Sequence, residues 1–229
     1  MVENAEFDLV VYGASGFTGR LVAEYMVNKY EGSNIAWAMA GRNDAKLAEV
    51  RNEIGASGDT PLFVADSTDK ATLTAMAKAT KCIISTVGPY TLYGEKLVEV
   101  CAQEGTDYVD LCGEVLFMRE MIAKHEEAAK KSGARIVFSC GFDSIPFDLG
   151  VQFLEEEAVK RLGAPCPRVR TRLRGLRGSM SGGSVMSFMV TREAMKKDPS
   201  LLGPLMDPFA LTGGFVGPEQ PPANEVMED

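Results

Sequence analysis

The sequence predicts an α/β protein with a doubly wound parallel sheet, and three observations lead to this fold class. Six short apolar segments alternate with helical patterns between residues 7 and 139. The first segment, 7–12, runs directly into a glycine-rich turn, 13–19 (GASGFTG), and this turn opens a helical pattern. A strand, a glycine turn and a helix in this order begin the βαβ unit of dinucleotide-binding domains, so the predicted sheet is of the Rossmann type.

The expected strands and helices alternate along the chain. The strands are 7–12, 35–40, 62–65, 82–86, 108–111 and 135–139, with helices at 70–79, 96–103 and 115–131 among the segments between them. The cluster Ser67-Thr68-Asp69 is a good N-cap for the helix at 70–79, and Gly105 and Gly133 end the two later helices. Short right-handed crossovers between parallel strands then place helices on both faces of the sheet.

The pattern changes after Ala164, where two prolines break the preceding helix. Residues 168–174 alternate arginine with less polar residues, which predicts a strand with an arginine face. Residues 185–190 are apolar, and 201–229 read as loop or disorder. We therefore expect a dinucleotide-binding domain at 1–164 and, at 165–229, the start of an incomplete second α/β domain for substrate binding or dimerisation, with a flexible tail.

Composition limits the functional classes. The formal charge of −8 argues against nucleic-acid binding, which needs a basic surface. The five cysteines are odd in number, widely spaced and without a Cys-x-x-Cys motif, so we expect reduced thiols, no metal site and a cytoplasmic location. The acidic, polar N-terminus shows no signal peptide, and no apolar run is long enough to span a bilayer.

The glycine turn and the end of the second strand predict the cofactor. The turn residues Gly13, Ser15, Gly16, Phe17, Thr18 and Gly19 would hold a pyrophosphate at a helix N-terminus. The second strand ends at Arg42, where NAD-selective folds place an acidic residue. A guanidinium suits a 2′-phosphate, so we expect NADP (as NADPH). Alternatively, Arg42 caps a helix or lies in solvent, and Asp44 is close enough to compete for the ribose.

The ends of the third and fourth strands supply further candidate contacts. We expect Asp66 and Ser67 to contact the adenine, although either could instead cap the next helix. Thr86, Val87 and Gly88 end the fourth strand in a tight turn, where the backbone could lie against the cofactor.

The proton donor cannot be identified from the sequence, and Tyr90 and Asp143 are the two catalytic candidates. Tyr90 could face the nicotinamide or pack at the rim, and Asp143 could instead cap a helix. Glu114 could serve acid–base chemistry, but we favour its being a first-turn acid of the next helix. The arginine face of 168–174 could dock an anionic substrate, but we favour a solvated face. His125, the single histidine, lies on a polar helix face and receives no catalytic role.

Five motifs occur together and in order, and together they are more specific than any one of them. They are 13–20 (GASGFTGR), 40–42 (AGR), 86–90 (TVGPY), 108–114 (YVDLCGE) and 141–146 (GFDSIP). The set resembles the saccharopine dehydrogenase-like oxidoreductases and, within them, the trans-acting enoyl reductases of lipid and polyketide assembly. The resemblance covers residues 5 to 190. It implies a nicotinamide cofactor, a mixed α/β second domain over the cofactor cleft, and relatives that continue well beyond residue 229.

The residues and the resemblance together lead to a functional hypothesis. We expect an NADP-dependent oxidoreductase that transfers hydride to an enoyl thioester or an imine carbon, so the expected partner is a small molecule or an acyl thioester. Peripheral association with lipid or membrane and a homodimer are left open. The alternatives are a nucleotide-binding or lipid-associated interaction protein without turnover, and an inactive fragment.

Overall fold

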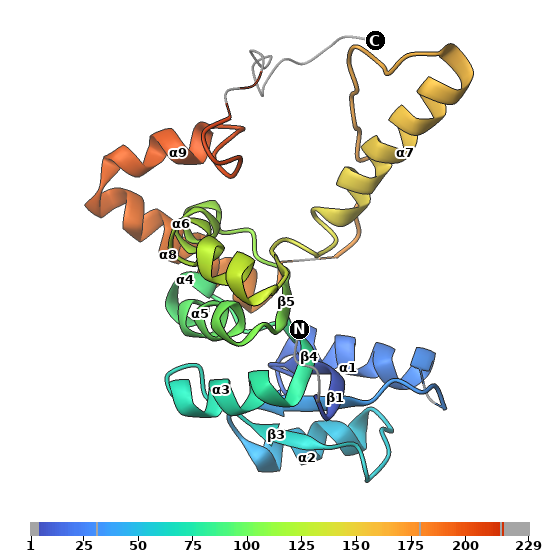
Figure 1. Ribbon diagram of the computed structural model, residues 1–229, viewed down its shortest axis with the longest axis vertical. Helices are drawn as coiled ribbons and strands as arrows, with labels where there is room; N and C mark the ends of the chain where they lie inside the picture. The colour runs from blue at the N-terminus through green and yellow to red at the C-terminus, as the bar shows by residue number, and fades with distance from the viewer. Residues whose placement is uncertain (1–4, 31, 179, 216, 218–229) are drawn as a thin grey trace.

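A six-stranded parallel sheet forms the centre of the computed structural model (Figure 1), which describes residues 5–30, 32–178, 180–215 and 217. Its strands are β1 (Phe7–Tyr12), β2 (Trp37–Gly41), β3 (Leu62–Val64), β4 (Thr80–Ser85), β5 (Asp107–Asp110) and β6 (Ile136–Val137). The spatial order is β3-β2-β1-β4-β5-β6, and every neighbouring pair is parallel. The Rossmann-type prediction is therefore confirmed. The chain changes direction across the sheet between β1 and β4, which is where such folds bind nucleotides.

Helices cover both faces of this sheet. They are α1 (Phe17–Tyr30), α2 (Asp44–Glu53), α3 (Lys70–Ala79), the short α4 (Tyr90–Tyr93), α5 (Glu95–Glu104) and α6 (Val115–Ser132). The predicted cap of α3 is confirmed, because the Asp69 carboxylate accepts a hydrogen bond from Ala71 N at 2.9 Å. Gly105 and Gly133 end α5 and α6 with φ values of 79° and 80°, a conformation that glycine adopts at low cost.

Two apolar layers hold the helices to the sheet. Val10 and Val11 are adjacent in β1 and fully buried, and they point into opposite layers, as alternation along a strand requires. Val11 packs in a cluster with Met39 and residues of α1 and α2, whereas Val10 packs with Ile83 and residues of α3, α5 and α6. Strands buried on both faces explain the nearly continuous apolar runs in the sequence.

The second part of the chain contains further helices. They are α7 (Ile145–Leu162), α8 (Gly182–Lys197), a 3-10 turn (Pro199–Leu201) and α9 (Leu202–Met206). Figure 1 shows α7 projecting away from the sheet, whereas α8 returns and packs against α4. In the described part of the chain, no helix is long and apolar enough to cross a membrane.

Three sequence predictions differ from the structure. The predicted strand at 168–174 is wrong: these residues are irregular, since no strand of the described chain lies beside them to complete backbone hydrogen bonds. The last predicted strand, 135–139, shortens to the two residues of β6. The predicted loop from 201 onward contains the short helix α9, and the tail at 218–229 lies outside the described residues.

Candidate functional site

The glycine turn is fixed at the carboxyl end of β1 by its own backbone. Gly13 N and Ala14 N donate hydrogen bonds to Ala40 O at 2.9 and 3.1 Å, which ties the turn to β2. Gly13 has a φ of 88°, and a Cβ atom there would lie 2.6 Å from Thr86 Oγ1. Position 13 therefore requires glycine for its conformation and for its close approach to the end of β4.

Gly19 permits a second close approach, between α1 and the turn. A Cβ atom at this position would lie 2.1 Å from Gly13 O and 2.7 Å from Thr86 Oγ1. Thr86 Oγ1 in turn donates a hydrogen bond to Tyr12 O at 2.9 Å. Gly19 thus serves the packing of α1 against β1 and β4. The first N–H groups of α1 have no partner within the helix.

A cavity of about 250 Å³ lies over the turn, and we call it the turn cavity. It brings together eight of the predicted cofactor residues, from the ends of the four strands β1, β2, β3 and β4. They are Gly13, Ser15, Gly16, Arg42, Ser67, Thr86, Val87 and Gly88. Phe17 and Thr18 line the adjoining cavity described below, whereas Gly19 and Asp66 line neither cavity.

Arg42 supplies the positive charge of the turn cavity. Its exposed guanidinium makes no hydrogen bond or ion pair with any described residue. The cap of α2 is Asn43, whose side chain accepts from Lys46 N at 2.9 Å, so the alternative in which Arg42 caps this helix is wrong. A permanent cation beside Ser67, without an ion-pair partner, is suited to a phosphate group.

Asp66 has a local role at the start of the next helix. Its carboxylate accepts from Thr68 N at 2.8 Å and from Thr68 Oγ1 at 2.7 Å. These hydrogen bonds, with a further contribution from the charge of Arg42, lower the pKa of Asp66. The turn before α3 therefore uses the Asp66 carboxylate, while Ser67 lines the cavity. The alternative in which Asp66 or Ser67 caps this helix is wrong, because the cap is Asp69.

Tyr12 is a cavity residue that the sequence analysis missed. It is the last residue of β1, and it lines the turn cavity together with Ser67. Burial raises the pKa of Tyr12 to about 12, so the hydroxyl stays protonated. A signal was available, because the last residue of a strand before a glycine turn lies at the ligand-binding edge of such a sheet.

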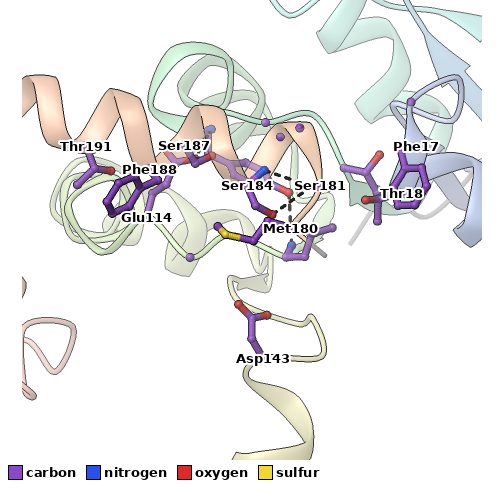
Figure 2. Close-up of a pocket in the computed structure, with 18 residues that line it drawn as sticks. Phe17, Thr18, Glu114, Asp143, Met180, Ser181, Ser184, Ser187, Phe188 and Thr191 are labelled. Carbon is purple, nitrogen blue, oxygen red and sulfur yellow. Dashed lines mark hydrogen bonds between the residues drawn. The ribbon is translucent and has the colours of Figure 1, made fainter. Parts of the chain in front are cut away.

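A larger cavity of about 630 Å³ adjoins the first one beneath the start of α8, and we call it the α8 cavity (Figure 2). The two cavities share Gly16, Thr86 and Gly88. Figure 2 shows Phe17 and Thr18 at one end, Phe188 and Thr191 at the other, and Asp143 on the side away from α8. The site therefore has a small part over the glycine turn and a roomier part beside it.

The two catalytic candidates differ in what their side chains can do. Tyr90 is 5% exposed; its hydroxyl donates to Ser85 O at 3.0 Å and accepts from Leu111 N at 3.4 Å. Burial raises its pKa well above the ordinary value, so its proton is held within the fold. Asp143 instead presents an exposed carboxylate to the α8 cavity, with no hydrogen bond from a described side chain or amide.

Glu114 lies at the expected helix start but does not cap that helix. It occupies the N-cap position of α6, and its side chain makes no capping hydrogen bond there. The carboxylate instead accepts from Tyr90 N and Thr91 N at 2.8 Å, from Thr91 Oγ1 at 2.6 Å and from Ser187 Oγ at 2.7 Å. Burial acts to raise the pKa of Glu114, but the hydrogen bonds from Thr91, Ser187 and Tyr90 outweigh it and lower this pKa.

His125 lies on α6, away from both cavities, and predicts a pH dependence of stability. Its Nε2 atom is buried without a hydrogen-bond partner in the described structure. Burial lowers its pKa below the ordinary 6.5, against the opposing effect of Glu99 and Glu95 and with help from Lys124 and Lys70. Because the folded pKa is below the unfolded one, the associated stability is complete above about pH 6.5 and is lost as the pH falls below it.

We expect His125→Leu to remove this loss, since leucine suits the neighbouring Val98, Met121 and Phe138. The measurement is the urea midpoint of both proteins between about pH 7 and pH 5, where the difference between them isolates His125 because all other titrating groups are common to both. An equal decline in wild type and variant would contradict the assignment to His125.

Comparisons with known proteins agree with this geometry. A family model, the saccharopine dehydrogenase NADP binding domain, matches residues 9–137. The chain is 41% identical over 212 residues to a trans-acting enoyl reductase of Mycobacterium leprae, covering 92% of this chain and 50% of that protein. It is also 41% identical over 209 residues to a trans-acting enoyl reductase of Mycobacterium tuberculosis, covering 90% and 50%. The chain thus spans about half the length of these relatives.

A solved structure shares the fold. It is the apo saccharopine dehydrogenase (L-Glu forming) of Saccharomyces cerevisiae, with a TM-score of 0.53 and 23% identity, covering 69% of this chain and 32% of that one. The family match extends over more than half of the present chain and names the cofactor that Arg42 predicts. The NADP prediction is confirmed, and the chain belongs to the saccharopine dehydrogenase NADP-binding domain family.

Proposed function

We propose that this chain binds NADPH in the turn cavity and acts in an oxidoreductase that reduces an enoyl thioester. The observation that carries this proposal is the position of Arg42, without an ion-pair partner in the described structure, over a glycine turn that adjoins the α8 cavity. The enoyl substrate follows from the names of the mycobacterial relatives, and an imine substrate is the alternative.

Each part of the site has a task in this proposal. The N–H groups at the start of α1 bind the pyrophosphate, and Arg42 and Ser67 bind the 2′-phosphate. Thr86, Val87 and Gly88 lead from the turn cavity towards the α8 cavity. The nicotinamide supplies the hydride when it is bound.

The α8 cavity receives the substrate in this proposal. Phe17, Met180 and Phe188 line it with apolar surface that limits access of water to the reacting atoms. Asp143 is our candidate for holding the proton, because its carboxylate faces the cavity and has no hydrogen bond within the described structure. Tyr90 positions the loop after Gly88 through its hydrogen bond to Ser85 O.

Arg42→Asp tests the cofactor assignment. We expect NADPH affinity to fall by about 10- to 100-fold, as for loss of a charge-assisted contact of roughly 1.5–3 kcal/mol. Affinity for NADH should stay equal or improve, because a carboxylate can accept from the ribose 2′-hydroxyl. Calorimetric titration of wild type and variant with both nucleotides gives the answer.

Lys46→Asp is the matched control, since it makes the same charge change on the exposed surface of α2, outside the turn cavity. An equal loss of NADPH affinity in this control, or no loss in Arg42→Asp, would remove Arg42 from the site. If NADPH binds but remains unoxidised with every enoyl thioester and imine offered, the chain is a nucleotide-binding protein without turnover.

A further inference from the structure

The Glu114 carboxylate joins the loop after Gly88 to α8. Glu114 is 6% exposed, and its Oε1 atom accepts from Tyr90 N at 2.8 Å and from Ser187 Oγ at 2.7 Å. Its Oε2 atom accepts from Thr91 N at 2.8 Å and from Thr91 Oγ1 at 2.6 Å. One buried side chain thus contacts both the start of α4 and the middle of α8.

The start of α4 depends on this carboxylate. The N-cap residue of α4 is Pro89, which makes no side-chain capping bond. Glu114, which lies between β5 and α6, accepts hydrogen bonds from the first N–H groups of α4. In most helices these groups are capped by the side chain of the N-cap residue. Because Gly88 lines both cavities and directly precedes Pro89, any movement of the start of α4 changes the shared wall of the site.

The four hydrogen bonds also exclude Glu114 as the proton donor or acceptor of the reaction. An ionised carboxylate offers about four lone-pair sites, and four donors of the fold already occupy them. Transfer of a proton to either oxygen would break at least one of these bonds.

The position of α8 depends on few other contacts. None of the described residues of α8 is buried, so apolar packing fixes this helix only weakly. Its first residues and Ser187 line the α8 cavity. Figure 2 shows Ser187 beside Glu114 at the end of the cavity opposite Phe17.

We propose that Glu114 is a positioning residue that clamps α8 to the start of α4, so that NADPH bound against Gly88 stabilises α8 over the substrate cavity. The clamp itself follows from the hydrogen bonds, and its response to NADPH rests on the proposed function. A charge-assisted hydrogen bond at the Ser187 end is strong enough to couple the two segments.

Ser187→Ala tests the clamp at its α8 end, with amide hydrogen exchange of the full chain as the measurement. Alanine keeps the helix, because it has the highest helix propensity. We expect exchange of the amides at 184–191 to become about tenfold faster or more, as for loss of a hydrogen bond to a charged group. In wild type, NADPH should slow exchange both in the turn at 13–19 and in α8, whereas in Ser187→Ala it should slow only the turn.

Ser184→Ala is the matched control, because this serine lies on the same helix and its hydroxyl contacts Ser181 instead of Glu114. It should keep the response of α8 to NADPH. As a second variant, Glu114→Gln keeps the size of the side chain but replaces one accepting oxygen by a donor, and it should speed exchange in both α4 and α8.

The outcomes separate the clamp from the proposed function. If Ser187→Ala matches Ser184→Ala in exchange without nucleotide, the clamp is refuted, whatever NADPH does. If α8 of Ser187→Ala still slows with NADPH as in wild type, the coupling through Glu114 is refuted. If NADPH slows no amide of the turn even in wild type, the proposed function fails, while the comparison without nucleotide still decides the clamp.

Discussion

Gly19→Ala is expected to destabilise the protein by about 3 kcal/mol or more and to abolish NADPH binding. The new Cβ atom would lie 2.1 Å from Gly13 O and 2.6 Å from Gly13 C, both of which are backbone atoms. Overpacking typically costs about 1–3 kcal/mol and more where the neighbour cannot turn aside. Relief requires α1 to move away from the turn, which also displaces the helix N-terminus that would bind the pyrophosphate.

Urea unfolding and NADPH titration measure the two effects. Gly150→Ala in α7 is the control, because its Cβ atom meets nothing within 4 Å and alanine stabilises a helix interior by about 1 kcal/mol relative to glycine. If Gly19→Ala had the same stability and NADPH affinity as the wild type, α1 would be able to shift without cost and the prediction would be contradicted.

Asp110→Ala is expected to cost about 3 kcal/mol or more, because each buried donor left without a partner costs about 1–3 kcal/mol. Asp110 is 2% exposed. Its Oδ1 atom accepts from Cys112 N at 3.0 Å and from Ser139 N at 2.9 Å, and its Oδ2 atom accepts from Tyr108 Oη at 2.7 Å. Truncation leaves three donors without a partner at the end of β5, beside the segment that carries Glu114.

Asp110→Asn distinguishes the hydrogen bonds from the charge. The amide oxygen can replace Oδ1, and the amide nitrogen can donate to the Tyr108 hydroxyl oxygen, so the variant should lose much less stability than Asp110→Ala. Burial raises the pKa of Asp110, which means that the fold already disfavours its charge. Equal urea midpoints for wild type and Asp110→Ala would contradict the structural role given to this carboxylate.

The elements that local pattern determines could be predicted from the sequence. Apolar runs that alternate with helical patterns identified all six strands, and Asp69 and Gly105 marked the helix boundaries where the structure has them. The strand predicted from the alternation at 168–174 is wrong for a physical reason. A strand forms only beside another strand that completes its hydrogen bonds, and alternation in the sequence does not supply that neighbour.

Contacts between distant segments could not be predicted. The Glu114 carboxylate bonds to residues 23, 24 and 73 positions away, and the sequence around it reads equally well as an ordinary helix start. The strand ends were informative because parallel strands bring their carboxyl ends to one edge, which is why Arg42, Ser67 and Gly88 were found. Tyr12 obeys the same rule, but the sequence analysis treated it only as the last residue of an apolar strand.

The packing of Gly13 and Gly19 against Thr86 changes how a glycine fingerprint should be interpreted across a family. Both residues satisfy an internal steric demand of the fold, independent of any nucleotide. A descendant that had lost its cofactor would therefore still be under selection to retain them, while Arg42, which makes no hydrogen bond or ion pair within the described fold, would be free to drift. In such a family the glycines indicate common ancestry and a shared fold, whereas the residue at position 42 better indicates whether the protein still binds the nucleotide.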